Sequence, residues 1–126
     1  MKQNVKWIVG AVVLLLASGT AVAFALKPGA QLPTTAEMSI ALRAVSDVWG
    51  RYGYVPTVTS GTDGEHGDDS LHYDGLALDF RTKDLSPRLK QQMIADVRDE
   101  LGGSYDVVLE FAGSANEHLH IEYDSM

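Results

Sequence analysis

Two segments of the chain carry hydrophobic residues at helical spacing. The first predicted helix opens at Thr34, which forms a capping box with Glu37, and the second opens at Ser86 with Pro87 at its first position. Gly102 follows the second segment and marks its end. Both segments are expected to face one hydrophobic core. Their apolar stripes are Ile40, Ala41, Ala44, Val45, Val48, Trp49 and Tyr52 in the first helix and Leu89, Met93, Ile94, Val97 and Leu101 in the second.

Short apolar or alternating runs between and after these helices predict four strands. They span residues 55–60, 76–81, 105–111 and 118–123. The resulting order is helix, two strands, helix, two strands, which predicts an α+β domain with a single core. We expect a small antiparallel sheet with both helices on one face, which leaves the other face for a functional site.

The N-terminal segment has the pattern of an export signal. Lys2 and Lys6 precede an uncharged run over residues 7–26, which is just long enough for a membrane span of about 20 residues. Two Ala-x-Ala triplets near the end of the run suit signal peptidase. We expect residues 1–26 to be a signal peptide or a membrane anchor, 27–33 a linker and 34–126 a domain exported to the periplasm or the exterior. If uncleaved, the segment would hold the domain at the inner membrane.

Charge and cysteine content narrow the classes of partner and site. The formal net charge is -7 at pH 7, so the domain is not expected to bind nucleic acid. The chain has no cysteine, so an exported domain would depend on packing and a bound metal ion rather than on disulfides. A metal site in this chain would have to use His, Asp or Glu ligands.

Two short segments supply such ligands. His72 and Asp79 flank a predicted turn at Asp74-Gly75, which can aim both side chains at one point. His118 and His120 alternate by two and would share one face of a strand. A catalytic zinc ion typically takes three ligands of these types and keeps one open position, so the segments together predict a hydrolytic metal site.

The same residues resemble the zinc D-Ala-D-Ala carboxypeptidases and related peptidoglycan peptidases, whose fold is shared with the signalling domain of hedgehog proteins. The family pattern is Ser-x-His-x-x-Gly-x-Ala-x-Asp followed by a distant Glu-x-x-His or His-x-His. The resemblance spans residue 34 to the end, and residues 59–66 are similar to those of small phage-encoded members. The matching positions are Ser70, His72, Gly75, Ala77, Asp79, Glu117, His118 and His120.

The resemblance implies both a ligand set and an activity. Zinc would be bound by His72, Asp79 and His120, in a cleft on the face of the sheet opposite the helices. The protein would then be a zinc metallopeptidase that hydrolyses peptidoglycan stem peptides in cell-wall degradation, as lysis enzymes of phages and prophages do. The alternative is a binding or signalling module that keeps the zinc fold without turnover, as hedgehog domains do.

Three residues are candidates for the catalytic base. Glu117 matches the family's Glu-x-x-His, but strand alternation would place it opposite His120 unless the chain bends near Asn116. His118 is the second candidate, as the first histidine of His-x-His members. Glu110 is the third, because an acid inside an apolar run is unusual; a position at an exposed edge of the sheet is the alternative.

His66, Arg81 and Ser70 are the predicted substrate-binding residues. Arg81 closes the strand of Asp79, where a guanidinium group could pair with a carboxylate or polarise a carbonyl; an ordinary solvated charge is the alternative. His66 lies six residues before His72, as a histidine does in hedgehog proteins. Carboxypeptidase members often have Tyr-Arg-Ser in the upstream strand, where this chain has Thr-Ser-Gly-Thr at residues 59–62. An L,D-type endopeptidase is therefore as consistent with the sequence as a carboxypeptidase.

An acidic loop precedes the metal motif. Asp63, Glu65, Asp68 and Asp69 supply four carboxylates, and oxygen-rich loops suit calcium. Hedgehog domains hold calcium near their zinc cleft, so calcium is a second candidate ion. A solvated surface loop is the alternative interpretation.

Overall fold

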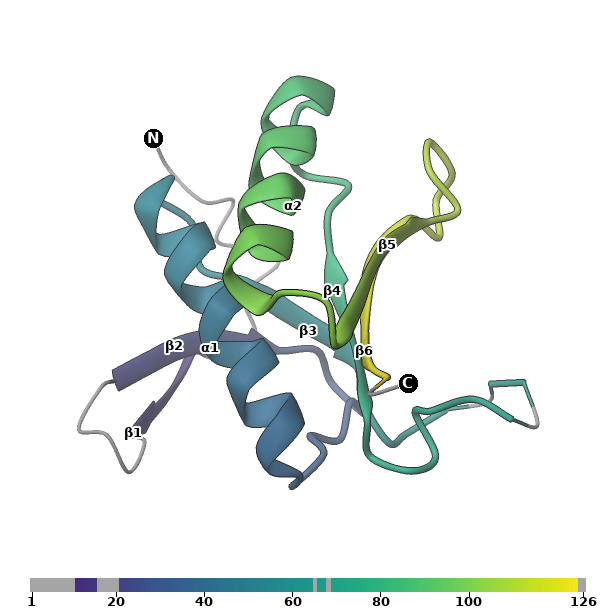
Figure 1. Cartoon of the computed structure of the whole chain (residues 1–126). Coiled ribbons are helices and arrows are strands. Elements are labelled where there is room, and N and C mark those ends of the chain that lie inside the picture. Colours follow the sequence, from purple (N-terminus) through teal and green to yellow (C-terminus); the bar gives the residue numbers. More distant parts are fainter. Residues whose placement is uncertain (1–10, 16–20, 65, 68, 125–126) are drawn as a thin grey trace.

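A mixed β-sheet with two helices forms the fold (Figure 1). The computed structural model describes residues 11–15, 21–64, 66, 67 and 69–124. The order of strands across the sheet is β1-β2-β3-β4-β6-β5. The elements are β1 (Ala11–Leu15), β2 (Ala21–Leu26), α1 (Ala36–Arg51), β3 (Thr57–Ser60), β4 (Ala77–Arg81), α2 (Pro87–Leu101), β5 (Tyr105–Glu110) and β6 (His118–Tyr123).

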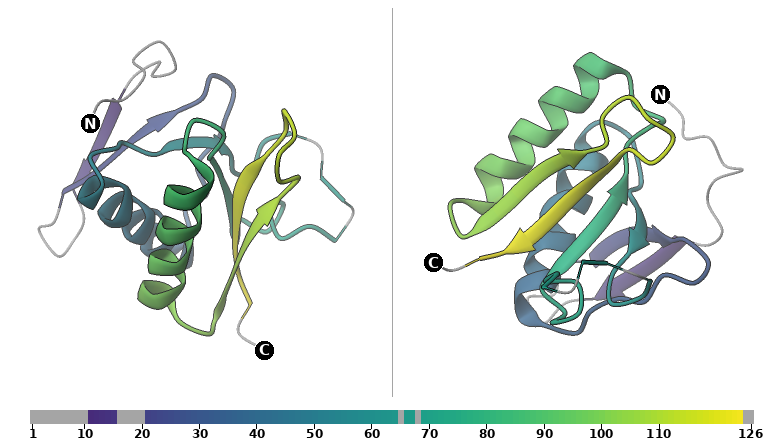
Figure 2. Two further views of the ribbon diagram at one scale, coloured as in Figure 1. Left: turned by 90° about the horizontal axis from the view of Figure 1, so that it is seen from above. Right: turned by 90° about the vertical axis from the view of Figure 1, so that its right-hand side faces the viewer.

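Both helices lie on the same face of the sheet, as predicted (Figure 2). The α+β class is also confirmed. The prediction of an antiparallel sheet is wrong for one pair, because β2 runs parallel to β3. Parallel pairing needs a crossover connection, and helix α1 provides it. The helix returns the chain to the end of the sheet at which β2 begins, so β3 runs in the same direction as β2.

The helix ends and the core differ only in detail from the predictions. Thr35 rather than Thr34 caps α1, because its Oγ1 accepts a hydrogen bond from the backbone N–H of Met38. Ile40 is 55% exposed and does not belong to the core, whereas Met38 and Leu42 do. Ser86 caps α2 as predicted, and Gly102 ends it with a φ of +78°.

The N-terminal region contributes strands that the sequence analysis did not expect. β2 joins the sheet beside β3, and Ala25 N donates to Pro56 O at 2.8 Å. Phe24 is fully buried in the core. Neither helix in the described part of the chain has the length and apolar character that a membrane span needs. Residues 1–10 and 16–20 lie outside the described residues, so an export signal or anchor over residues 1–26 stays a prediction.

Strands β4 and β6 determine which side chains reach the face opposite the helices. They pair antiparallel in the middle of the sheet. Phe80 on β4 and Leu119 and Ile121 on β6 are buried in the core with the helices. Strand alternation then directs Asp79 and His120 to the other face, where they are cross-strand partners.

Candidate metal centre and adjoining pockets

Asp79 and His120 form the centre of the candidate site. Their Cα atoms are paired across β4 and β6, and His120 Nδ1 lies 2.8 Å from Asp79 Oδ1. Both side chains are buried. The other ring nitrogen of His120, Nε2, lies 2.7 Å from Glu122 Oε1 on the same face of β6. The ring of His120 is therefore held at both nitrogens.

His72 reaches the same point from the turn that precedes β4. Its Nδ1 donates to the carbonyl of Gly61 at 2.7 Å, and its Nε2 lies 3.2 Å from Asp79 Oδ1. The turn closes at Gly75, whose φ of +70° suits glycine. The hydroxyl of Thr35 donates to Gly75 O at 2.6 Å, which ties the turn to the start of α1. The turn predicted at Asp74-Gly75 is therefore formed, and it brings the side chain of His72 to that of Asp79, as predicted.

The three residues form a group that can hold a metal ion. One ligand atom from each of His72, Asp79 and His120 lies within 4.8 Å of the others. In each histidine the nitrogen that does not face Asp79 is bonded to Gly61 O or to Glu122. Metal-binding histidines almost always have such a partner, because it fixes the tautomer and the ring orientation. The donor set and its supporting contacts therefore fit a metal ion.

The electrostatics of the group also favour binding a cation. Burial opposes ionisation of Asp79, but hydrogen bonds from His120 and His72 outweigh it and hold the pKa of Asp79 well below its usual range. Burial also opposes protonation of His120, yet its hydrogen bonds with Asp79 and Glu122 raise the pKa of His120 to about 9. The shift of His120 reflects the acids around its ring, whereas the shift of Asp79 reflects the histidines that donate to it.

His118 and Glu110 lie beside this group as a second pair. His118 Nε2 is 2.9 Å from Glu110 Oε1 and 3.7 Å from Asp79 Oδ2. The other ring nitrogen, Nδ1, donates to the carbonyl of Asn116 at 2.8 Å. Asp79, Glu110 and His118 also form a group with metal-ligand spacing. Two of the three candidate bases therefore meet at the edge of the site.

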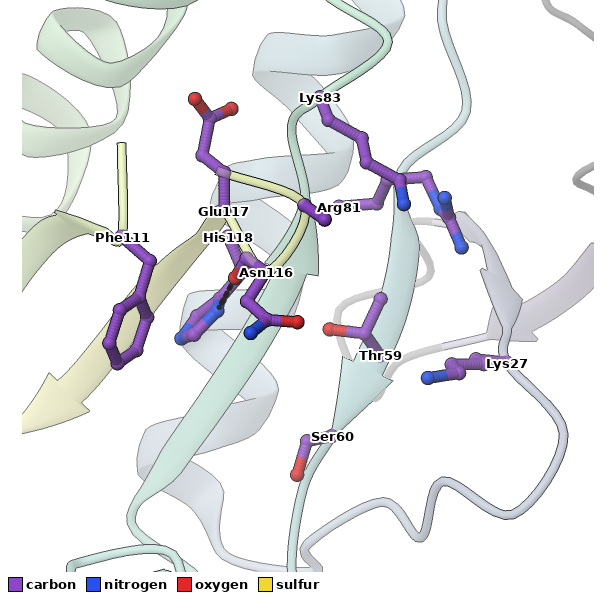
Figure 3. Close-up of a pocket in the computed structure, with 10 residues that line it drawn as sticks. Lys27, Thr59, Ser60, Arg81, Lys83, Phe111, Asn116, Glu117 and His118 are labelled. Carbon is purple, nitrogen blue, oxygen red and sulfur yellow. Dashed lines mark hydrogen bonds between the residues drawn. The ribbon is translucent and has the colours of Figure 1, made fainter. Parts of the chain in front are cut away.

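Glu117, the first candidate for the base, lies elsewhere. Its carboxylate accepts hydrogen bonds at 2.6 Å from both Lys90 Nζ on α2 and Thr82 Oγ1, and at 3.0 Å from Gly113 N. Figure 3 shows this carboxylate directed away from the ring of His118. The bend near Asn116 that would turn Glu117 towards His120 is not formed, because β6 alternates regularly from His118 onwards.

The surroundings of Glu117 make it a structural anchor for the loop before β6. Its side chain is buried with that of Lys90. Burial opposes ionisation, but the hydrogen bonds from Lys90, Thr82 and Gly113 and the charge of Lys90 lower the pKa of Glu117 to about 2. Lys90 was not among the residues predicted from the sequence. Its spacing could have identified it, because Lys90 lies three and four residues before the buried Met93 and Ile94 and therefore on the core face of α2.

His66 and Ser70 both contact His72. The rings of His66 and His72 are stacked, with centroids 3.9 Å apart and planes inclined by 7°. His66 Nε2 donates to Asp63 O at 2.9 Å, which fixes the orientation of that ring. Ser70 Oγ accepts a hydrogen bond from His72 N at 3.2 Å. Both residues line the cavity next to the metal group.

Two cavities adjoin the candidate site. One has a volume of about 550 Å³ and includes the metal group in its walls. The other has a volume of about 370 Å³ and is lined in part by Arg81, His118 and Phe111 (Figure 3). Arg81 does not line the first cavity, so its predicted contact with substrate would be made in the second. Phe111 and His118 line both.

The acidic loop is only partly described. Asp63 Oδ1 accepts hydrogen bonds from the backbone N–H groups of Gln31 and Gly61, both at 2.8 Å. This oxygen therefore orders the loop that carries the carbonyl acceptor for His72. Glu65 and Asp68 lie outside the described residues. Calcium binding at this loop stays a prediction.

Comparison with known proteins does not identify this chain. A scan against protein-family models and a search of curated proteins both found no match. The feature that bears most directly on function is the group formed by His72, Asp79 and His120, which could hold a metal ion.

Proposed function

We propose that the protein is a zinc metallopeptidase that hydrolyses peptide bonds in peptidoglycan stem peptides. The observation that carries the proposal is the group of His72, Asp79 and His120, in which each histidine is braced at its second nitrogen. Two histidines and one carboxylate are a ligand set typical of catalytic zinc, which needs an open fourth position. The resemblance of the motif to peptidoglycan peptidases supports the choice of substrate.

The chemistry divides between the metal ion and the residues next to it. A zinc ion at this group supplies Lewis acidity, which makes water more acidic and polarises a peptide carbonyl. His72 Nε2 and His120 Nδ1 are the nitrogens directed at Asp79, so they are the donors available to the ion. Gly61 O and Glu122 keep those rings in place, and Asp79 supplies negative charge.

The proton transfers are assigned to Glu110 and His118. His118 Nδ1 carries a proton, since it donates to a carbonyl, so its Nε2 shares a proton with Glu110 Oε1 across 2.9 Å. Such a pair can accept a proton from the attacking water and return it to the departing nitrogen. Glu117 is unsuited to this step, because Lys90 and Thr82 occupy its carboxylate on the helix side of the sheet.

The cleft beside the group suits a short peptide. Its volume of about 550 Å³ is within the range of ligand pockets, about 300–1,000 Å³. In this proposal the substrate lies between two loops. One carries His66 and Ser70, and the other connects β5 to β6 and begins with Phe111. Export of the domain, its relation to the hedgehog fold and a role in lysis belong to the same proposal.

The test is hydrolysis by the purified protein. Peptidoglycan fragments are incubated with zinc-loaded protein, and new amino groups and released D-alanine are quantified. We expect product with zinc, none after chelation and recovery when zinc is restored. Asp79→Asn should be inactive, whereas Asp99→Asn, an exposed change on α2, should be as active as the wild type. Stoichiometric zinc without any product would instead favour the binding module.

A further inference from the structure

The two adjoining cavities differ in charge. The cavity at the metal group is lined by four acids, namely Asp69, Asp79, Glu110 and Glu122. The neighbouring cavity is lined by Lys27, Arg81 and Lys83. Among the described residues that line this second cavity, Glu117 is the one acid, and its carboxylate is bonded to Lys90. A chain with a net charge of -7 therefore gathers three cations around one pocket.

The basic residues come from separate parts of the chain. Lys27 follows β2, Arg81 ends β4, and Lys83 lies in the connection from β4 to α2. Figure 3 shows their side chains around the hollow that Thr59 and Ser60 also line. The hydroxyl groups of Thr59 and Ser60 can donate hydrogen bonds to the same ligand. Like charges that converge in this way favour an anionic ligand.

A shared wall connects this pocket to the metal cleft. Phe111 and His118 line both cavities, and their ring centroids are 5.8 Å apart. Phe111 is 65% exposed and has a φ of +52°, in the left-handed region that non-glycine residues rarely adopt. A strained residue with an exposed aromatic ring between two cavities is the kind of feature that recurs at ligand-binding sites.

From these observations we infer that the pocket of Lys27, Arg81 and Lys83 binds a carboxylate of the substrate, within about one residue of the bond that is cleaved. This inference rests on the proposed function and names the class of substrate. The acidic cleft takes the cation, the basic pocket takes the anion, and the peptide passes His118 and Phe111 between them. The peptide is thus held at two points, the bond that is cleaved and the carboxylate next to it.

The carboxylate can have two sources in a peptide. It is the free C-terminus if the protein removes a terminal residue, and an acidic side chain if it cleaves within the peptide. Both present the same group to Lys27 and Lys83. The experiment therefore needs probes that carry one or the other.

Binding can be measured separately from turnover by NMR titration of the full chain, followed at the backbone amides of Lys83 and Asn116. The probes are N-acetyl-D-alanyl-D-alanine, its C-terminal amide, and N-acetyl-alanyl-glutamate α-amide, whose one carboxylate is on the side chain. We expect at least one acid probe to bind about tenfold tighter than the amide, in the metal-free and the zinc-loaded protein. Affinity should fall with added salt, since the interaction is between charges.

Two variants locate the interaction. Lys27→Gln and Lys83→Gln should each weaken binding of the preferred acid about fivefold, as expected for loss of one partly exposed ion pair. Arg88→Gln, the same loss of one charge at an exposed residue outside the pocket, should leave binding unchanged. The acid that binds better identifies the source of the carboxylate.

The outcomes also separate this inference from the proposed function. Tight binding of an acid probe that depends on Lys83, without hydrolysis of any peptide, would keep the carboxylate pocket and reject the peptidase. Equal binding of the acids and the amide, or equal effects of Lys83→Gln and Arg88→Gln, would overturn the pocket even if hydrolysis occurs.

Discussion

Glu110 Oε1 and His118 Nε2 lie 2.9 Å apart, across the pair of strands β5 and β6. The two residues are cross-strand partners, so the register of the sheet brings their side chains together. Asn116 O fixes the other nitrogen of the ring. A proton between these two side chains is therefore held at a defined position beside the candidate metal group.

The first prediction concerns this pair. Glu110→Gln and His118→Gln should each lower kcat about 10²-fold to 10⁴-fold, because either change removes a partner in the proton transfer. Zinc content and the melting temperature should remain close to those of the wild type. Steady-state kinetics and metal analysis on the same preparations check this.

The matched control is Glu117→Gln, assayed well below its melting temperature. It makes the same chemical change as Glu110→Gln, but at a carboxylate on the helix side of the sheet, away from the candidate site. We therefore expect kcat to fall less than fivefold. If Glu117→Gln lost about 10³-fold while Glu110→Gln remained active, the family's Glu-x-x-His assignment would be correct and the present one wrong.

The second prediction concerns the candidate metal ligands. Replacing His72, Asp79 or His120 with alanine should abolish stoichiometric zinc, because each supplies one of three donors. Glu122→Gln should weaken zinc binding about 10-fold to 100-fold, the usual effect of losing the partner of a metal-binding histidine. Competition titrations with a chromophoric chelator measure both effects. Full occupancy in the His72→Ala protein would rule out this ligand set.

The third prediction concerns the buried pair of Glu117 and Lys90. Glu117→Gln should destabilise the fold by about 3 kcal/mol, because it leaves a buried ammonium group without its partner. Glu100→Gln is the comparison. That carboxylate pairs with Arg51 at the surface, where such a pair contributes at most about 1 kcal/mol. Urea denaturation at pH 7 measures both variants.

The same pair gives a pH dependence with a definite sign. The pKa of Glu117 falls from 4.5 to about 2 in the folded protein, so its contribution is fully present above pH 4.5. That contribution is lost as the pH falls towards 2. The difference in unfolding free energy between wild type and Glu117→Gln should therefore shrink over this window. A difference that stays constant from pH 7 to pH 2.5 would show that the charge of Glu117 does not stabilise the fold.

The metal group was predictable from the sequence because its geometry depends on local rules. Asp79 and His120 lie on the expected faces of two regular strands, and the turn at Gly75 brings His72 to them. Glu117 was assigned by a spacing pattern, although strand alternation pointed to the opposite face. Where the pattern and the alternation disagreed, the backbone geometry determined the position of the side chain.

Other features depended on contacts between distant parts of the chain. The position of Glu110 opposite His118 follows from the register of β5 and β6, which the sequence alone did not establish. The basic pocket needs Lys27 and Lys83 to meet across the sheet. Strands β1 and β2 were missed because uncharged apolar runs near an N-terminus also suit an export signal.

The fourth prediction concerns this N-terminal region. Removing residues 1–26 takes away β2 and the fully buried Phe24, so the shortened protein should melt at a lower temperature than the full chain. Loss of the Phe24 side chain alone costs about 3–5 kcal/mol in a typical core. Thermal unfolding of both forms with zinc bound checks this. Equal melting temperatures would show that β2 is dispensable, as expected of a cleaved leader.

Phe111 creates a conflict between what favours folding and what favours ligand binding. Its left-handed backbone costs about 1 kcal/mol or more, and its ring is too exposed to recover that by burial. A library randomised at this position and screened for heat resistance alone should become enriched in glycine and asparagine. The same library screened for turnover should keep aromatic residues. The residues that favour stability at this position would therefore be those that reduce activity, and the reverse.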